Sequence, residues 1–399
     1  MSKTCCVPLG FIRIVTCVGL ACALAGQGHA APYVPASGEQ VVERVPGLSD
    51  PAHRELRRMR AALTASPENL HLASELARRY IEMARSTGEP RYTGYAQAAL
   101  SPWWNQSQPP TQVRVLRATI LQSRHQFSQA LADLDAVLAA DRRNAQAWLT
   151  RATIQQTQGE HDKARESCSQ LNGLAPELVV IACIAGADSL GGEAAQSYAL
   201  LDAALKASVG LGPGIEGWVL TLLAEMAASQ GDYPAAEKHF LRALSLSDSD
   251  IYLLGAYADF LLDQERAGEA ATLLRDNTRA DGLLLRYALA LRRQGLPAAE
   301  QIDTLQSRFA AAALRGDSVH LREQARYELH LRNDPQAALE LAQKNWREQK
   351  ETADARILLE AAVAGNAGEA ARPVLNWLNR TGTKDRVLRM LAAKLEGAA

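Results

Sequence analysis

The hexamer RATILQ at residues 117–122 recurs as RATIQQ at residues 151–156, an offset of 34 residues. In each copy the alanine is followed twelve residues later by another alanine, Ala118 by Ala130 and Ala152 by Ala164. The later members of such pairs, or their equivalents, stand at positions 130, 164, 236, 270, 337 and 371. Most steps are 33 or 34 residues, and the step from 164 to 236 equals two units plus four residues. A fixed period of this length indicates an array of repeated supersecondary units.

Close packing between helices accounts for the paired alanines. Two antiparallel helices joined by a short turn need small side chains where their axes cross, and one alanine in each helix provides them. Apolar residues at helical spacing, such as Leu220, Leu223 and Ala227, surround these positions. Ala and Leu abound, whereas aromatic residues make up only 5% of the chain, which favours helices over sheets. The sequence therefore predicts an all-α fold built from helix pairs.

Two segments carry the signature of a known family. The segment AWLTRATIQQTQGEHDKARESCSQLNGLAP, residues 147–176, resembles a tetratricopeptide repeat at Trp148, Ala152, Gly159, Ala164 and Pro176. Residues 222–244 resemble the same repeat at Ala224, Gly231, Tyr233, Ala236, Phe240, Ala243 and Leu244. Two units depart from the pattern, because Tyr198 and Glu300 stand where the second alanine is expected. The resemblance implies a right-handed superhelical solenoid of about nine antiparallel helix pairs over residues 67–380.

Shorter segments are expected on either side of the repeat array. Residues 31–49 contain APYVPASG and VPG and predict an extended linker. Residues 50–66 predict a first helix that Asp50 caps and Pro51 begins. Residues 381–399 predict a terminal helix that covers the last exposed face, as solenoids require.

The first thirty residues predict a signal for export. The apolar run from Ile14 to Leu24 would rise only about 16 Å as a helix, too little to span a bilayer core of about 30 Å. Small residues at positions 28 and 30 suit cleavage after Ala30. Cleavage after Ala25 and lipidation of Cys22 are the alternatives. No other segment is long and apolar enough to cross a bilayer, and the signal together with the Arg-rich, Ala-rich composition favours the periplasm.

The stretch GPGIEG at residues 212–217 has the G-x-G-x-x-G spacing of a dinucleotide-binding loop. Such a loop must follow a strand and open a helix. The preceding residues, AAQSYALLDAALKAS, have a helical Ala/Leu pattern instead. The stretch also falls where the repeat carries four extra residues. We therefore interpret it as a lengthened joint between two helix pairs, not as a nucleotide site.

Two cysteines remain once the signal is removed. Cys168 and Cys183 form an even pair in an exported chain, which favours a disulfide. They fall near the end of one predicted helix and inside the next, where the distance between Cα atoms can reach the range that a disulfide requires. Two independently buried thiols are the alternative.

The sequence contains no recognisable catalytic or metal-binding set. The eight histidines do not stand at the helical spacing of a zinc site, and no G-x-S-x-G, H-E-x-x-H or phosphate-loop motif occurs. The formal net charge of −1 indicates no general affinity for nucleic acid. We therefore expect a chain that is not an enzyme and holds no cofactor or metal.

The inner surface of the solenoid is the expected place for function, because first helices line the concave side of such arrays. Helical spacing places Glu225, Asp259 and Asp263 of the central units on this face. The C-terminal units contribute six basic residues: Arg292, Arg293, Arg322, Arg326, His330 and Arg356. Guanidinium groups suit a carboxylate, such as an acidic stretch or the C-terminus of a partner. A solvated face with local ion pairs is the alternative.

Trp103 and Trp104 form the other candidate contact. Adjacent helical positions point in different directions, so we expect that both cannot face one core. Either one indole is exposed for a peptide or glycan, or the extra residues of this unit fold the pair over the helix ends. Together with the family resemblance, these features predict a periplasmic scaffold that binds a protein or peptide in its concave groove, as an adaptor in the assembly of an envelope complex. A periplasmic protein that binds a glycan or small ligand is the alternative.

Overall fold

The computed structural model describes residue 37 and residues 51–316 and 319–397. The chain divides into a unit of residues 1–54 and a unit of residues 55–399, and the features discussed below belong to the second. The predicted signal peptide, residues 1–30, lies outside the described residues. So does the predicted linker, residues 31–49, apart from residue 37.

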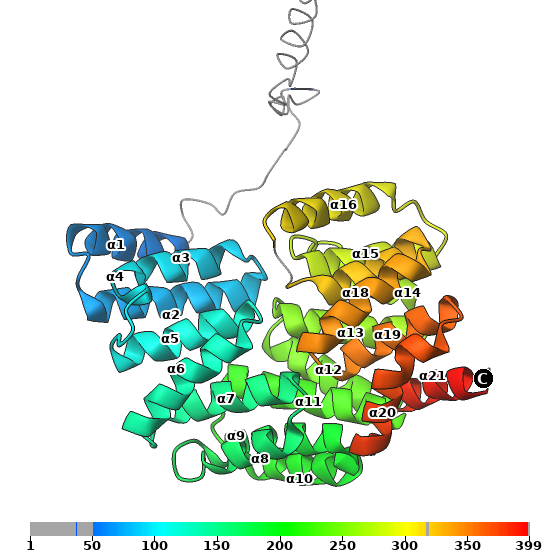
Figure 1. Cartoon of the computed structure of the whole chain (residues 1–399), viewed down its shortest axis with the longest axis horizontal. Coiled ribbons are helices and arrows are strands. Elements are labelled where there is room, and N and C mark those ends of the chain that lie inside the picture. Colours follow the sequence, from blue (N-terminus) through cyan, green and yellow to red (C-terminus); the bar gives the residue numbers. More distant parts are fainter. Residues whose placement is uncertain (1–36, 38–50, 317–318, 398–399) are drawn as a thin grey trace, which may run out of the picture. The chain divides into compact units, whose positions relative to one another are not determined.

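Within the described residues, nine helix pairs follow one another along the chain (Figure 1). The pairs are α2 (Leu70–Thr87) with α3 (Arg91–Ala99), α5 (Thr111–Ser123) with α6 (Phe127–Ala140), α7 (Ala145–Thr157) with α8 (His161–Ser169), α9 (Glu177–Asp188) with α10 (Ala194–Ala207), α11 (Pro213–Gln230) with α12 (Tyr233–Leu246), α13 (Ile251–Asp263) with α14 (Ala267–Leu274), α15 (Asp281–Arg293) with α16 (Ala299–Leu314), α17 (Leu321–Tyr327) with α18 (Pro335–Glu348), and α19 (Thr352–Ala364) with α20 (Arg372–Thr381). No strand occurs in this part of the chain. The prediction of an all-helical, tetratricopeptide-type array is confirmed.

Six further elements complete the described chain. Helix α1 (Pro51–Ala65) precedes the pairs, α4 (Ser101–Trp104) lies between the first two, and α21 (Arg386–Glu396) follows the last. Two π-helical turns, η1 (Ser189–Glu193) and η2 (Glu328–Arg332), and one 3-10 turn, η3 (Gly368–Ala371), lie at helix junctions. The segment η1 contains a kink, because Gly192 has a positive φ, whereas η2 matters for the register of the repeat, because a π-turn adds a residue to a helical turn.

The paired alanines lie where the helices of a pair cross. Ala118 and Ala130 are fully buried, and so are Ala152 and Ala164. The prediction fails by one residue at Ala337, which is half-buried, while its neighbour Ala338 is fully buried. The π-turn η2 lies between the two helices of this pair and shifts the register by one position.

The stretch with dinucleotide-like spacing is a joint between helices. Helix α10 ends at Ala207 and α11 begins at Pro213, with Gly212 as its N-terminal cap. Gly214 and Gly217 lie inside α11. Since a helix and not a strand precedes the glycines, the interpretation as a lengthened joint is confirmed.

The repeat array also contacts itself across long sequence separations, along a line that we call the seam. The ends of first helices in the early pairs meet residues of the late pairs. The Lys350 N–H donates to the Thr157 carbonyl at 2.7 Å, and Gln349 bonds to His125 Nδ1 at 3.1 Å. The first of these bonds satisfies a carbonyl at the C-terminal end of α7, which the helix itself leaves without a partner.

Glycines allow the backbones to approach at the seam. Gly192 has φ +96°, and a Cβ at this position would lie 2.7 Å from the carbonyl oxygen of Gly382. At Gly159, with φ +75°, a Cβ would lie 3.0 Å from the Cβ of Lys350. Both positions therefore need glycine for the left-handed backbone and for the space as well.

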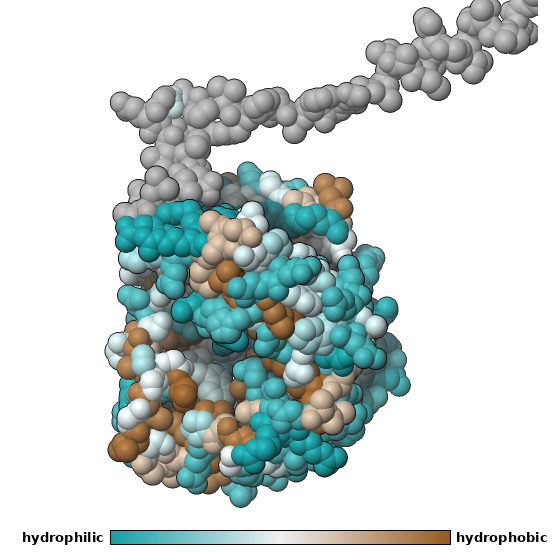
Figure 2. Space-filling view, turned by 90° about the vertical axis from the view of Figure 1, so that its left-hand side faces the viewer, coloured by the Kyte–Doolittle hydropathy of each residue, from teal (hydrophilic) through white to brown (hydrophobic). Residues whose placement is uncertain are grey.

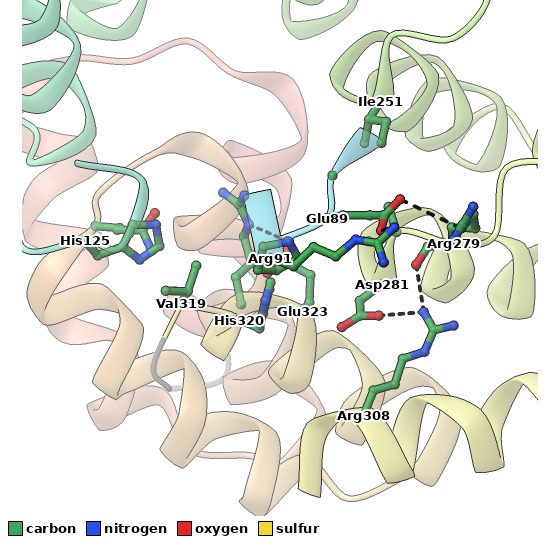
Figure 3. Close-up of a pocket in the computed structure, with 16 residues that line it drawn as sticks. Glu89, Arg91, His125, Ile251, Arg279, Asp281, Arg308, Val319, His320 and Glu323 are labelled. Carbon is green, nitrogen blue, oxygen red and sulfur yellow. Dashed lines mark hydrogen bonds and ion pairs between the residues drawn. The ribbon is translucent and has the colours of Figure 1, made fainter. Parts of the chain in front are cut away.

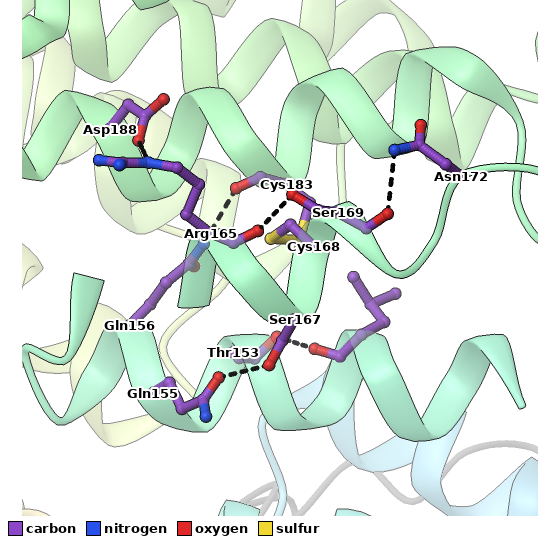
Figure 4. Close-up of a disulfide and its surroundings, with 11 residues drawn as sticks. Thr153, Gln155, Gln156, Arg165, Ser167, Cys168, Ser169, Asn172, Cys183 and Asp188 are labelled. Carbon is purple, nitrogen blue, oxygen red and sulfur yellow. Dashed lines mark hydrogen bonds and ion pairs between the residues drawn. A yellow bond between two sulfur atoms is a disulfide. The ribbon is translucent and has the colours of Figure 1, made fainter. Parts of the chain in front are cut away.

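A disulfide joins the third and fourth helix pairs (Figure 4). Cys168 on α8 and Cys183 on α9 are bridged with their Cα atoms 5.6 Å apart, and both residues are buried. The Gln156 side chain donates to the Cys183 carbonyl at 3.1 Å. The predicted pairing of these two cysteines is present in the structure.

Candidate functional site

Charged side chains from successive first helices meet on one surface, which we call the inner face. Several of its residues stand four apart within a helix, as Asp259 and Asp263, Arg322 and Arg326, and Arg356 and Glu360 do, and residues at this spacing lie on one side of a helix. They are Glu225 of α11, Tyr252, Asp259 and Asp263 of α13, Arg286 of α15, Arg322 and Arg326 of α17, His330 of η2, and Asp354, Arg356 and Glu360 of α19. The acidic central residues and four of the six predicted basic residues therefore share this face with one another.

Asp259 is the central acceptor of the inner face. Arg326, which is 67 residues further along the chain, donates to both of its carboxylate oxygens at 2.8 and 3.3 Å. Arg286 donates to Oδ2 at 2.6 Å. Burial opposes ionisation of Asp259, but the two guanidinium groups outweigh it and hold the pKa well below its usual value. The carboxylate is therefore ionised at any physiological pH.

A second set of bonds joins α13 to α19. Arg356 donates to both carboxylate oxygens of Asp263 at 2.6 and 2.7 Å, and its Nε donates to Glu360 at 2.7 Å. His330 Nε2 lies 3.0 Å from the other oxygen of Glu360. Burial favours the neutral carboxyl, but His330 and Arg356 together lower the pKa of Glu360 to about 2. Bidentate geometry of this kind fixes the relative position of two helices.

Arg322 holds the N-terminal end of α19. It donates to Glu351 at 2.9 Å and to the fully buried Asp354 at 3.3 Å, and it also pairs with Glu323 at 3.3 Å. Burial raises the pKa of Asp354 to about 6, an effect that Arg322 only partly offsets. Asn345 donates a further hydrogen bond to Asp354 at 2.8 Å.

Tyr252 is the aromatic residue of the inner face. Its hydroxyl donates to Glu225 at 2.8 Å, yet 65% of the tyrosine surface remains exposed. Burial raises the pKa of Glu225 to about 7, although the bond from Tyr252 favours the ionised form. This pair is the part of the inner face most open to a ligand.

Arg292 and Arg293 do not belong to this network. Arg292 donates to the Leu331 carbonyl and, at 3.3 Å, to Asn333, while Arg293 donates to the Leu262 carbonyl at 2.5 Å. Both guanidinium groups therefore satisfy carbonyls at the ends of neighbouring helical segments. The predicted stripe misplaced them because it extrapolated helical spacing to the last turn of α15.

The tryptophan pair lies against the cores of the first repeats. Trp103 and Trp104 are both half-buried and pack on one apolar cluster, and Trp104 also contacts the next cluster. The expectation that the two indoles cannot face one core is wrong, because the four-residue helix α4 lies across the ends of longer helices. This placement matches the alternative in which the extra residues fold the pair over the helix ends.

A cleft of about 500 Å³ opens at the seam, and the sequence analysis did not anticipate it (Figure 3). Four arginines line it: Arg91, Arg279, Arg308 and Arg322. Only Arg322 was a predicted site residue. The others come from the start of α3, the residues before α15 and the middle of α16, so no single repeat reveals the cluster.

The described residues contain no group of three or more His, Cys, Asp or Glu side chains placed to hold a metal ion. None of the described helices is long and apolar enough to cross a membrane. Figure 2 shows one side of the molecule, on which hydrophilic residues predominate in the upper part and hydrophobic groups gather lower down.

The described chain is an array of antiparallel helix pairs, and its fold is similar to that of tetratricopeptide repeat proteins. Similar solved structures include a tetratricopeptide repeat protein from Parabacteroides merdae, at 14% identity over 72% of this chain and 98% of that chain, with a TM-score of 0.33. IFIT1 with Gppp-AAAA aligns at 14% identity over 88% and 96%, with a TM-score of 0.41. Yeast Tom70 aligns at 12% identity over 87% and 91%, with a TM-score of 0.31. Similarities this distant assign no ligand. No family model and no curated protein matches the chain.

Proposed function

We propose that the chain is a non-enzymatic scaffold of the periplasm that binds an extended segment of a partner protein on its inner face. The export signal expected in the sequence and the disulfide, which suits an oxidising compartment, support this location. An adaptor role in the assembly of an envelope complex is the setting that the family resemblance favours.

The observation that carries the proposal is the partial exposure of a densely bonded polar face. The side chains of Arg326, Asp263 and Arg356 keep 20%, 30% and 32% of their surface exposed, and Tyr252 keeps 65%. The ion pairs hold these groups in fixed positions, so a partner loses little entropy in ordering them. An exposed tyrosine within such a face is the kind of anchor that recurs at protein interfaces.

An acidic segment or a C-terminal carboxylate is the partner chemistry that fits Arg322, Arg326, His330 and Arg356. Such a group would compete with Asp259 and Asp263, which now occupy the guanidinium groups. Binding is therefore an exchange of one carboxylate for another, and its strength depends on the internal pairs.

The test is photocrosslinking in cells, with a photoreactive phenylalanine analogue at Tyr252 and, as control, at Tyr95, which is 42% exposed on α3. We expect one partner to be captured from position 252 only. Arg326→Gln should lower its yield, whereas Asp259→Asn should maintain or raise it, because the arginine is then free of its internal carboxylate. Equal capture from both tyrosines, or parallel losses in the two variants, would contradict a binding role for the inner face.

A further inference from the structure

The arginine cleft is a second site, distinct from the inner face in all of its lining arginines except Arg322. Its walls come from the turns between α2 and α3 and between α5 and α6, the starts of α13 and α15, helix α16, the start of α17 and the turn before α19. A volume of about 500 Å³ lies within the range of small-molecule sites. The cleft forms where the seam brings the first two helix pairs against the sixth, seventh and eighth.

The arginines of the cleft present hydrogen-bond donors on both sides. Arg91 pairs with Glu89 at 2.6 Å and keeps 43% of its side-chain surface exposed. Arg308 uses only Nη1 for its bonds, at 2.7 Å to Asp281 and 2.8 Å to the Arg279 carbonyl. Its side chain is 38% exposed, so Nε and Nη2 remain available to a ligand. Planar guanidinium groups of this kind suit phosphate and carboxylate oxygens.

Two helix starts add to the positive character of the cleft. Neither Pro90, which precedes α3, nor Ala280, which precedes α15, supplies a side-chain cap. Both residues line the cleft. Several first-turn N–H groups already donate to preceding carbonyls, Tyr92 to Glu89 at 3.2 Å, Thr93 to Pro90 at 3.1 Å and Leu283 to Ala280 at 3.1 Å. The contribution of these helix starts is therefore the helix dipole, which favours an anion beside them.

Three carboxylates also line the cleft, and they narrow the choice of ligand. Glu89, Asp281 and Glu323 have lone pairs beyond those that the arginines occupy. Such oxygens accept hydrogen bonds from hydroxyl groups and repel a ligand that is anionic throughout. A ligand that fits both sets of groups carries an oxyanion at one end and hydroxyl donors at the other.

We propose that the arginine cleft binds a small phosphorylated sugar or polyol. The phosphate lies between Arg91 and Arg308, near the start of α15, and the hydroxyl groups donate to Asp281 and its neighbouring carboxylates. The bound molecule therefore spans the seam. Neither the inner face nor a protein partner is needed for this binding, so the proposal stands apart from the scaffold function.

Isothermal titration of the purified full chain tests the proposal with glycerol phosphate, inorganic phosphate, glycerol and glucuronate as probes. We expect glycerol phosphate to bind more tightly than the other three. Arg91→Gln and Arg308→Gln should each weaken it at least about tenfold, the loss expected for one charge-assisted contact. The control Arg380→Gln, an exposed residue of α20, should bind as the wild type does.

The variant Asp281→Asn tests the hydroxyl contacts of the proposed ligand separately from its phosphate contacts. We expect this variant to bind inorganic phosphate at least as well as the wild type, while glycerol phosphate loses its advantage. Absence of binding by glycerol phosphate up to about 10 mM would overturn the proposal, as would full retention of binding in the double variant of Arg91 and Arg308. Tighter binding of glucuronate would replace the phosphate with a carboxylate and would also overturn it. Circular dichroism on each variant verifies that it is folded.

Discussion

A single methyl group at Gly192 should disrupt the seam, and the matched substitution at Gly382 should not. Gly192 and Gly382 face each other across the seam, and both have positive φ, +96° and +67°. An alanine Cβ at position 192 would lie 2.7 Å from the Gly382 carbonyl oxygen, whereas a Cβ at position 382 would meet no atom within 4 Å. The two substitutions therefore share the backbone strain and differ only in the clash.

The magnitudes follow from these two contributions. Left-handed backbone costs a residue with a Cβ about 1–2 kcal/mol, and this applies to both variants. The overlap at position 192 involves backbone atoms, which cannot rotate away, so η1 must move from the joint between α20 and α21. Forcing an extra carbon into a packed site costs about 1–3 kcal/mol. We therefore expect Gly192→Ala to destabilise the protein by about 2–5 kcal/mol and Gly382→Ala by about 1–2 kcal/mol.

Urea unfolding followed by circular dichroism measures the free energies, and hydrogen exchange locates the change. Repeat arrays can unfold in steps, so protection of the α20 and α21 amides is the more direct measurement. We expect Gly192→Ala to lower protection in these two helices, which lie about 190 residues away along the chain. Equal destabilisation by the two alanines, with unchanged exchange in α20, would show that the seam is not closed at this point.

Two further predictions concern groups that the structure places away from the seam glycines. Replacing Cys168 and Cys183 by alanine should lower the free energy of unfolding by about 3 kcal/mol, the loop-closure value for a separation of 15 residues; an unchanged urea midpoint would contradict the bond. Glu225→Gln should stabilise the protein relative to the wild type, by an amount that grows as the pH rises from about 5 to about 7. The pKa of Glu225 rises to about 7 on folding, so its favourable contribution is complete below its unfolded pKa and is lost as the pH rises through 7. The full shift corresponds to about 3 kcal/mol, which partial exposure reduces to about 1 kcal/mol. The free energy of unfolding, measured from pH 5 to pH 8, should therefore increase for the variant relative to the wild type across this interval. A constant difference between the two proteins would refute the raised pKa of Glu225.

The packing of the two helices within each pair could be predicted from the sequence alone. Alanines twelve residues apart predict the crossing points, because helix packing within a pair depends on a few neighbouring residues. Ala337 fails by one position because a π-turn leaves no clear mark in composition. Tyr198, which interrupts the pattern, lies one residue after the buried Ser197, and Ser197 in turn follows the buried Ala185 by twelve positions. The repeat is therefore present in that unit, in a register shifted by one residue.

The long-range part could not be predicted in the same way. The seam depends on curvature that accumulates over many repeats, and no single unit contains that information. Complementary charge was nevertheless visible in the sequence: Asp259 and Asp263 belong to the central units, and Arg326 and Arg356 to the late ones. Opposite charges predicted on one face of an array are a signal that the array can pair with itself. Arg326 and Arg356 pair with Asp259 and Asp263 within the array, so an external carboxylate must displace these partners.

Closure of the seam and occupation of the cleft are linked by thermodynamics. Arg91 belongs to an early helix pair and Arg308 to a late one, so the two lie on opposite sides of the seam. A ligand that contacts both therefore binds the closed array more tightly than an open one. Such a ligand must then stabilise the seam, and a variant that lowers the fraction of closed protein must lower the apparent affinity for the ligand in proportion to that fraction. Gly192 lies outside the cleft, so weaker binding of glycerol phosphate by Gly192→Ala, with Gly382→Ala unaffected, would arise from closure alone. Equal affinity for glycerol phosphate in the two variants would instead show that the cleft forms independently of this part of the seam.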